Sequence, residues 1–452
     1  MHGSGQYTPK RNAVETAALD IPFRKHVLDN GLDVVVHEDH GCPIVAVNVW
    51  YHVGSKNEAP GRTGFAHLFE HLMFEGSAHH DSGYFEPLQQ AGGQLNGSTN
   101  PDRTNYWEVV PSNALELALW MESDRMGFLL PALTDEKFAN QREVVLNERR
   151  QSYENRPYGM AGLAMVDALF PEGHPYHWPT IGAPDDLRAA TVEDVRAFFR
   201  RYYHPANASL AIAGDVGTDR ALDLASTYFG DLPAGEPPET VPRAPARALP
   251  SRRVMEDRVE VPRLYLGWLS PAMYAAGDAE LDLLADVLAS GKASRLYRAL
   301  VYERRMATDV SAYQGSRELG SSFQIAVTAV PGVGLEALER AVHDEVARVV
   351  SGGVTADELA RTLATTESAF VSRLQTVGGF GGKSDQLNSY NVLVGDPGYF
   401  SRDLARYRSA DQAAIRAAAA AHLDPRHCVT LSVVPPGAQH LAAPDSDPAV
   451  VA

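Results

Sequence analysis

Cysteine is the scarcest residue type in this chain, and its scarcity excludes some kinds of structure and site. Only Cys42 and Cys428 occur among 452 residues, toward opposite ends of the chain. A disulfide framework needs several cysteines and a thiolate zinc site needs closely spaced ones, so neither organises this protein. A single bridge between the two cysteines is left open.

Long apolar runs and an excess of basic residues are also missing. No stretch of about 18 apolar residues occurs that would span a bilayer, and residues 1–20 lack the apolar core of a signal peptide. We therefore expect a soluble, cytoplasmic protein, with a periplasmic location as the alternative if residues 1–5 (MHGSG) are a processed or tagged start. The 40 Lys and Arg against 57 Asp and Glu give a formal charge of −17, which argues against nucleic acids and anionic membranes as partners.

The most informative pattern that is present is a motif of five residues. Residues 67–71 read HLFEH, an H-x-x-E-H arrangement that reverses the common H-E-x-x-H zinc motif. Residues four apart share one face of a helix, so His67 and His71 can reach one metal ion with Glu70 beside them. A catalytic zinc needs three protein ligands and an open position for water, so a further ligand is expected. Taken alone, the pentapeptide fits an ordinary helix face about equally well.

The best candidate for the third ligand is Glu148. It lies in residues 134–154 (TDEKFANQREVVLNERRQSYE), which predict one long helix that ends at residues 155–157 (NRP). Glu148 shares a helical stripe with three residues that we expect to face inward: Phe138, Gln141 and Val145. An inward carboxylate needs a charged partner, and a zinc ion would provide one.

Further segments extend the pattern along the chain. Gly76-Ser77 follows the motif, then GGQLNGST at residues 92–99, DRTNY at residues 102–106, and finally Glu148. This order resembles the pitrilysin and insulysin family of inverted-motif zinc peptidases, in particular its branch similar to mitochondrial processing peptidase. The resemblance covers residues from about 23 to 436 and implies that this chain is a metal-bearing subunit. It implies one Zn²⁺ per chain, bound by His67, His71 and Glu148, with Glu70 activating the water.

The same resemblance assigns a role to residues 92–106. Locally they read as a Gly-Gly turn before a hairpin or strand. In the resembled family the matching stretch is an edge strand that pairs with extended substrate, a mode of recognition with little demand on sequence. The resemblance therefore implies substrate-binding roles for four residues: Asn96, Gly97, Ser98 and Thr99.

One position near the ligands departs from the family pattern. A second Glu often precedes the ligand Glu by one heptad, whereas this chain has Gln141 there. We expect Gln141 to support a ligand by hydrogen bonding, with a purely structural role as the alternative. Glu143 is the nearest carboxylate, and we keep it as a second supporting candidate although its helical phase places it on another face.

Prolines mark a boundary between two halves. Six of them predict an extended linker over residues 232–252: Pro233, Pro237, Pro238, Pro242, Pro245 and Pro250. On either side, His204-Pro205 and Asp424-Pro425 each separate a predicted helix from a buried strand. We therefore predict a duplicated α+β fold, each half a mostly antiparallel sheet covered by helices. Residues 21–231 would carry the zinc site, and residues 253–440 would lack one.

The second half carries the departure with the largest consequence. In single-chain members of the resembled family, the matching segment supplies an Arg and, seven residues later, a Tyr, which approach the substrate carbonyl. This chain has Val301 and Thr308 there. Because a donor to the oxyanion is worth about 3 to 4 kcal/mol, we expect a heterodimer whose homologous, zinc-less partner supplies the pair. A homodimer that uses Tyr302 or Arg304 is the alternative.

Two functions remain to be distinguished. The first is a zinc-dependent endopeptidase that hydrolyses unfolded peptides in a chamber between two homologous subunits. The second is a non-catalytic core subunit of a larger complex, a role that relatives of this fold have in respiratory complexes. Loss of the metal ligands would favour the scaffold, but all of them and Glu70 are present, so we prefer the peptidase.

Overall fold

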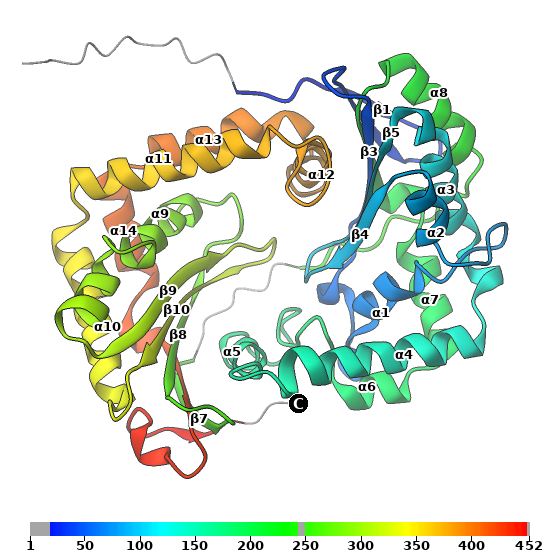
Figure 1. Cartoon of the computed structure of the whole chain (residues 1–452). Coiled ribbons are helices and arrows are strands. Elements are labelled where there is room, and N and C mark those ends of the chain that lie inside the picture. The colour runs from blue at the N-terminus through cyan, green and yellow to red at the C-terminus, as the bar shows by residue number, and fades with distance from the viewer. Residues whose placement is uncertain (1–18, 243–248, 450–452) are drawn as a thin grey trace, which may run out of the picture.

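The computed structural model describes residues 19–242 and 249–449 and consists of two halves that face each other (Figure 1). Each half contains a six-stranded sheet, in the orders β1-β2-β6-β3-β5-β4 and β12-β7-β11-β8-β10-β9. The two orders correspond from the second strand onward, whereas the outermost pairs differ: β1 is antiparallel to β2, and β12 is parallel to β7. In both, a parallel pair, β2 with β6 or β7 with β11, is followed by antiparallel pairs. The predicted α+β fold of two similar halves is confirmed.

The first sheet carries the candidate site at one edge. Its strands are β1 (Arg24–Val27), β2 (Asp33–Glu38), β3 (Ile44–Tyr51), β4 (Gln94–Thr99), β5 (Thr104–Pro111) and β6 (Ala208–Gly214). The middle strands β3 and β6 are buried nearly throughout, which explains why their apolar residues run continuously instead of alternating. β4 pairs with β5 alone. One row of its backbone hydrogen-bonding groups therefore faces away from the sheet.

The second sheet repeats this plan with a shorter outer strand. Its strands are β7 (Ser251–Glu256), β8 (Arg263–Ser270), β9 (Ala307–Gly315), β10 (Ser321–Ala329), β11 (Val429–Val434) and β12 (Asp447–Pro448). β9 occupies the edge that corresponds to β4. The last strand of this half, β12, lies beyond residue 440, the predicted boundary of the half.

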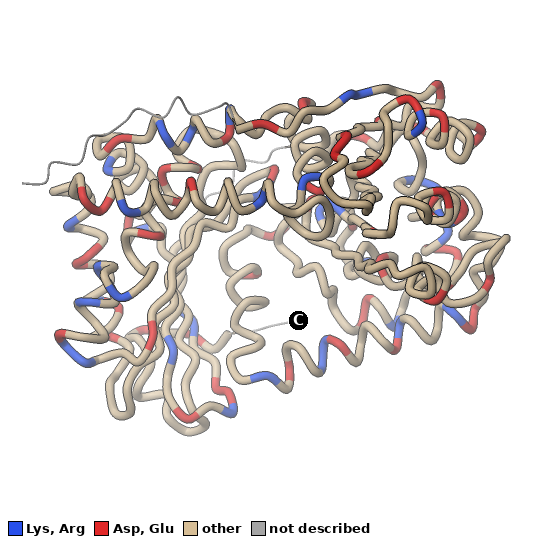
Figure 2. Tube along the Cα trace, turned by 45° about the horizontal axis from the view of Figure 1, so that its top comes forward, with Lys and Arg blue, Asp and Glu red and all other residues tan. Residues whose placement is uncertain are grey.

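Fourteen α-helices surround the sheets in the described parts of the chain. The first half contributes α1 (Phe65–Leu72), α2 (Phe85–Gln90), α3 (Leu115–Ala132), α4 (Asp135–Arg149), α5 (Ala161–Leu169), α6 (Pro184–Ala189), α7 (Val192–Tyr202) and α8 (Thr218–Phe229). The second contributes α9 (Asp278–Ala289), α10 (Leu335–Gly352), α11 (Ala356–Arg373), α12 (Lys383–Val394), α13 (Phe400–Ser409) and α14 (Gln412–His422). Charges of both signs are interspersed along the outer helices (Figure 2).

One helix of each half packs on the sheet of the other half. Met165 and Leu169 of α5 share a buried apolar cluster with Leu431 of β11. Conversely, Leu387 of α12 shares a buried cluster with Ala211 of β6. Pulling the halves apart would expose apolar surface on both sheets, so hydrophobic burial holds the halves together.

A buried ion cluster adds a second connection, which we call the inter-half cluster: Lys56, Asp102 and Glu318. Lys56 Nζ, on a side chain 3% exposed, lies 3.5 Å from Asp102 Oδ1 and also pairs with Glu318, in the loop between β9 and β10. Glu318 Oε2 lies 2.8 Å from His52 Nε2. Burial alone would raise the pKa of Glu318, but His52 and Lys56 lower it to about 2. Glu318 is therefore ionised at neutral pH.

The join between the halves runs from the end of α8 to the start of β7. α8 ends at Phe229, and β7 begins at Ser251, inside the predicted linker of residues 232–252. Residues 243–248 of that linker and residues 1–18 lie outside the described residues. Within the ranges that the structure covers, none of the helices combines the length and the apolar character needed to cross a membrane.

Candidate active site

The H-x-x-E-H motif forms α1, whose start is fixed by a glycine and a buried carboxylate. Gly64, at the N-cap, has a φ of 86°, a left-handed conformation that favours glycine. Glu58 accepts hydrogen bonds from the N–H groups of Gly64 (3.0 Å) and Ala66 (2.8 Å), as suits an acidic group at the positive end of a helix. The apolar face of α1 is buried through four residues: Phe65, Leu68, Phe69 and Leu72.

His67, His71 and Glu148 converge on one point. The Nε2 atoms of the two histidines lie 3.3 Å apart, and Glu148 Oε2 lies 3.5 Å from His67 Nε2 and 3.3 Å from His71 Nε2. Ligand atoms about 2.0 to 2.1 Å from a tetrahedral zinc ion are roughly 3.3 to 3.4 Å apart. The three atoms therefore have the spacing that zinc requires. They form the sole cluster of three or more potential metal ligands among the residues that the structure describes.

The protonation of the cluster also suits a metal. Burial, aided by the charge of His71, lowers the pKa of His67 to about 4, which favours the neutral imidazole with a free lone pair. Hydrogen bonding with His71 holds the pKa of Glu148 below its usual value. Metal ligands of these types bind as neutral imidazole and as carboxylate, so the donor set fits a zinc ion.

Glu148 reaches the cluster from the end of α4. Thr134 caps this helix with its side-chain oxygen, and the helix continues past Arg149 as a wider π-helical turn through Glu154. This matches the long helix predicted for residues 134–154. The residues expected to face inward are buried: Phe138, Gln141 and Val145.

Glu70 lies beside the cluster and next to Thr99 of β4. Burial raises the pKa of Glu70, while Thr99, His71 and Arg103 partly offset this rise. A carboxylate whose proton affinity is raised is suited to take up a proton and return it.

The edge strand β4 carries the four residues expected to contact substrate. Asn96 is exposed, and its Oδ1 accepts a hydrogen bond from the Gly97 N–H at 2.8 Å. Gly97 packs so closely that an added Cβ would lie 3.1 Å from the Tyr106 ring and 3.2 Å from the Phe74 ring. A cavity of about 460 Å³ adjoins this strand and is lined by Glu70, His71, Phe74, Glu75, Gly83, Phe85, Asn96 and Gln141. The structure thus brings Asn96 to the same cavity as Glu70.

The two predicted supporting residues have different surroundings. Gln141 is 8% exposed, and its Nε2 donates to Glu75 Oε1 at 2.5 Å. Gln141 therefore orients the carboxylate of Glu75, which lines the cavity, and not the side chain of any of the three candidate zinc ligands. The side chain of Glu143 is 58% exposed and lies 4.0 Å from Arg150. The expectation that Glu143 supports the ligands is therefore wrong, because its helical phase directs its side chain outward, away from the cluster.

Sequence reasoning missed two residues that shape the site. Glu58 caps α1 through backbone N–H groups, which leave no side-chain pattern in the sequence. Arg103 donates from Nη1 to both the backbone oxygen and Oγ of Ser98, each at 2.7 Å. Arg103 belongs to the DRTNY segment, but residue spacing does not indicate that its side chain contacts β4.

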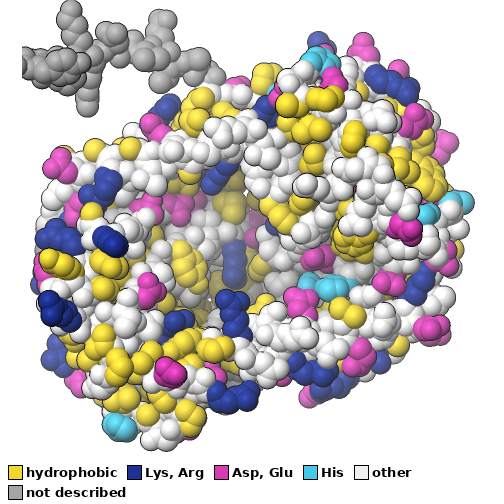
Figure 3. Space-filling model, viewed as in Figure 1, with side chains coloured by type: hydrophobic (Ala, Val, Ile, Leu, Met, Phe, Trp, Pro, Cys, Tyr) yellow, Lys and Arg dark blue, Asp and Glu magenta, His cyan; other side chains and the backbone are white. Residues whose placement is uncertain are grey.

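The positions matched to the family's Arg and Tyr lie away from the cluster. Val301 belongs to the π-helical segment Tyr297–Glu303, and Thr308 stands at the start of β9. The β9–β10 loop, which contacts the first half, follows the opposite end of β9. At about 3.3 Å per residue, that end of the strand lies roughly 23 Å from Thr308. Figure 1 shows β9 and α1 on opposite sides of the space between the halves, and Figure 3 shows a hollow there.

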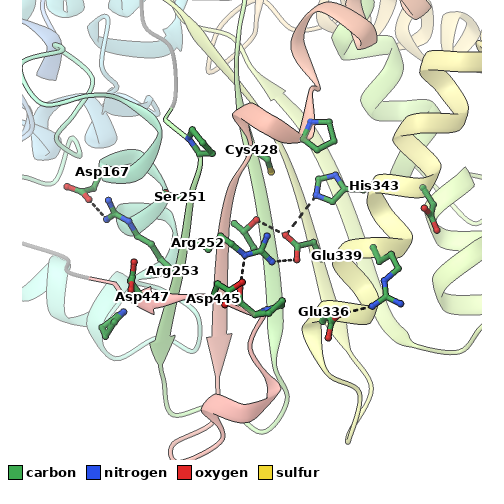
Figure 4. A pocket seen from close by; sticks show the side chains of 17 residues that line it. Asp167, Ser251, Arg252, Arg253, Glu336, Glu339, His343, Cys428, Asp445 and Asp447 are labelled. Atoms are coloured by element: carbon green, nitrogen blue, oxygen red, sulfur yellow. Dashed lines mark hydrogen bonds and ion pairs between the residues drawn. The ribbon is translucent and has the colours of Figure 1, made fainter.

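Another cavity lies elsewhere, mostly in the second half. It has a volume of about 1140 Å³, and its walls include Arg252, Glu339, His343 and Cys428 (Figure 4). Arg252 pairs with Glu339 across it. In the first half α8 follows β6 and packs on β2, whereas β11 is followed by a short 3-10 turn (Gln439–Leu441) and β12. The cavity therefore lies where the first half has a helix, and none of the predicted site residues lines it.

Comparison with known proteins identifies similar chains. The family described as Insulinase (Peptidase family M16) matches residues 33–167, and Peptidase M16 inactive domain matches residues 189–366. The zinc protease PqqE of Helicobacter pylori is 30% identical over 391 residues, which cover 83% of this chain and 82% of that protein. The crystal structure of a protease from Helicobacter pylori matches with a TM-score of 0.83 and 26% identity, over 92% of this chain and 100% of that chain. The periplasmic protease PqqL of Escherichia coli matches with a TM-score of 0.76 and 19% identity, over 94% of this chain and 49% of that chain.

Proposed function

Because the chain belongs to the M16 family of insulinase-like peptidases, we propose that it is a zinc-dependent endopeptidase acting on extended peptides. The observation that carries the proposal is the spacing of 3.3 to 3.5 Å among the candidate ligand atoms of His67, His71 and Glu148. Glu70 adjoins them. No second cluster of this kind occurs in the described part of the second half, in keeping with the inactive-domain description of residues 189–366.

Three residues would hold the metal and a fourth would move the proton. Bound zinc would supply Lewis-acid polarisation of a water molecule and of the peptide carbonyl. Glu70 would accept the proton that the attacking water loses and donate it to the nitrogen of the departing amine. Thr99 of β4, next to the Glu70 carboxylate, would help to keep this carboxylate oriented. The products are two shorter peptides, one with a new carboxylate and one with a new amine.

The open edge of β4 would position the substrate. An extended peptide that adds a strand to this edge satisfies the free backbone groups of β4. Thr99, in this strand, is close enough to Glu70 to lower the pKa of its carboxyl, so a peptide paired with β4 passes the catalytic carboxylate. Recognition by backbone pairing suits peptides that are unfolded.

We propose further that a homologous, zinc-less chain completes the site. Neither Val301 nor Thr308 can supply the donor groups of an Arg and a Tyr, and β9 lies across the hollow from α1. The chain spans about half of Escherichia coli PqqL, which is the length expected if two such chains equal one long relative. A homodimer is the competing assembly, in which Tyr302, a residue 76% exposed, or Arg304 would be the donor.

Cleavage of an internally quenched fluorescent peptide tests the proposal. The zinc-loaded chain would be assayed alone and mixed with a homologous chain that lacks the H-x-x-E-H motif, with and without chelator. Chelator-sensitive cleavage that requires the second chain is expected. Cleavage by the chain alone would replace the heterodimer with a self-sufficient assembly. A zinc-free chain with no turnover in either assay would overturn the peptidase and leave the non-catalytic core subunit.

A further inference from the structure

One face of the first sheet carries a polar row that ends at the open edge. Trp50 of β3, Asn105 of β5 and Ser98 of β4 stand opposite one another in register, so their side chains share a face. α12 packs on this face, and its Asp385 Oδ1 accepts hydrogen bonds from Trp50 Nε1 (2.9 Å) and Asn105 Nδ2 (3.2 Å). The row therefore belongs to the side of the sheet that faces the second half.

Arg103 lies on this row beside the edge strand. Its guanidinium carbon lies 5.1 Å from the centre of the Trp50 ring, and its Nη1 donates to the backbone oxygen and Oγ of Ser98. These contacts fix the plane of the guanidinium next to β4. Stacking on an aromatic ring and a fork of donors are features that suit Arg to binding carboxylates.

The cation of Arg103 lacks an anionic partner in contact. Among the described residues no carboxylate forms an ion pair with it, its Nε is buried without a hydrogen-bond partner, and Nη2 has no partner and is not buried. Asp385, Glu70 and Asp102 attract it only at longer range. Asp385 is occupied by Trp50 and Asn105, and Asp102 by the inter-half cluster.

An uncompensated cation at a half-buried position is unfavourable unless an anion approaches it. The open donor Nη2 belongs to the same guanidinium whose Nη1 contacts Ser98 of β4, the strand on which the proposed substrate would pair. Figure 3 shows that basic side chains gather in the hollow between the halves, although the chain as a whole is acidic. The free donor and its place beside β4 both indicate an anionic ligand.

We propose that Arg103 is a specificity-determining residue that binds a carboxylate of the peptide paired with β4. The carboxylate comes from an Asp or Glu side chain on the same face as Ser98, or from the C-terminus of the peptide. This inference rests on the proposed function, because it assumes that peptides pair with β4. It adds a preference for acidic peptides that backbone pairing alone would not produce.

Binding of labelled peptides tests the inference independently of turnover. The zinc-loaded Glu70→Gln chain would be titrated with uncharged, C-terminally amidated peptides in which one Glu, or one Gln, is moved along the sequence. The same Gln peptides with a free C-terminus test the second source of the carboxylate. We expect about tenfold tighter binding of the carboxylate peptide at one position or end, the effect of a charge-assisted hydrogen bond.

The Arg103 variants decide what causes the preference. In Arg103→Gln the ratio of the two affinities should fall to about one with binding of the Gln peptide unchanged, and Arg103→Lys should retain part of the preference. Arg200→Gln is the matched control, because Arg200 is exposed on α7 beside Glu193. Ser98→Ala keeps the charge while removing one contact, and so keeps the test valid if Arg103→Gln does not fold.

Three results would overturn the inference: no preference at any position, a preference that survives in Arg103→Gln, or equal weakening of both peptides. The last would mean that Arg103 only holds β4 in place. Cleavage of the same peptides by the wild-type assembly separates this failure from that of the proposed function. Zinc-dependent cleavage without a preference for acidic peptides would contradict only the role proposed for Arg103. Absence of cleavage would contradict the proposed peptidase function.

Discussion

Two glutamates of α4, at the scale of single residues, show how helical phase decides what a carboxylate does. Glu148 Oε2 lies 3.3 Å from His71 Nε2, whereas Glu143 is exposed beside Arg150. Side chains five residues apart on an α-helix differ in direction by about 140°, because five residues make one full turn and part of a second. The two side chains therefore point to different faces, and only Glu148 is a candidate ligand.

Replacing Glu148 with Gln is expected to weaken zinc binding by more than about 100-fold. It removes an anionic ligand, and changes to groups behind the ligands already cost about 10- to 100-fold. Glu143→Gln makes the same chemical change on the exposed face of the same helix and should leave the affinity unchanged. Competition with a chromogenic zinc chelator measures both variants. Equal affinities would exclude Glu148 as the third ligand.

The candidate ligands were predictable because helix geometry relates residues that are close in the chain. The spacing of His67 and His71 predicts one shared face, and the stripe that includes Val145 predicts that Glu148 faces inward. Arg103 was not predictable in the same way. Its contacts with Trp50 and Ser98 depend on the register of three strands, which residue spacing does not determine.

α1, at the scale of secondary-structure elements, depends on a buried carboxylate. Burial raises the pKa of Glu58 to about 8, against the opposing effect of hydrogen bonds from the N–H groups of Ala66 and Gly64. The folded chain therefore binds this proton more tightly than the unfolded chain does. Between pH 4.5, the ordinary pKa, and about 8, the folded state holds more protons.

The free energy of unfolding should therefore fall as pH rises from 4.5 to about 8. Glu58 contributes a slope of at most about 1.4 kcal/mol per pH unit in this window, and its contribution is fully present below pH 4.5. Glu58→Gln stays neutral and removes this part of the slope. Denaturant unfolding at a series of pH values compares the two proteins. Parallel curves over the window would show that Glu58 does not titrate as inferred.

The exchange of α5 and α12 marks the limit of prediction at this scale. An amphipathic pattern shows that one face of a helix is buried, and the predicted architecture covered each sheet with helices of its own half. In the structure Leu169 packs on the second sheet and Leu387 on the first. Both sheets present apolar faces of the same kind, so the sequence contains no local signal for the choice between them.

The inter-half cluster, at the scale of the whole molecule, makes the two halves one unit. Its residues Lys56 and Asp102 belong to the first half, and Glu318 belongs to the β9–β10 loop of the second half. The exchanged helices α5 and α12 add apolar contacts between the same two halves. We therefore expect access to the site to open between chains and not between the two halves of one chain. The cytoplasmic location stays a prediction at this scale.

Replacing Lys56 with Met should destabilise the chain strongly. It leaves two carboxylates without their buried partner, which commonly costs about 3 to 5 kcal/mol. Lys137→Met is the control, because Lys137 pairs with the exposed Asp81 and such pairs contribute about 0 to 1 kcal/mol. Denaturation midpoints in urea measure both. Small and equal losses would show that the inter-half cluster does not hold the halves together.

Glu70 is the residue on which the proposed hydrolysis depends most directly, and its replacement by Gln in the active assembly tests this role. Zinc content and hydrolysis of the quenched peptide would be determined on the same samples. We predict one zinc ion per chain in both proteins and a fall in kcat of about 100-fold or more in Glu70→Gln, as expected for loss of a general base. Undiminished turnover, or loss of the zinc ion with the activity, would contradict the role assigned to Glu70.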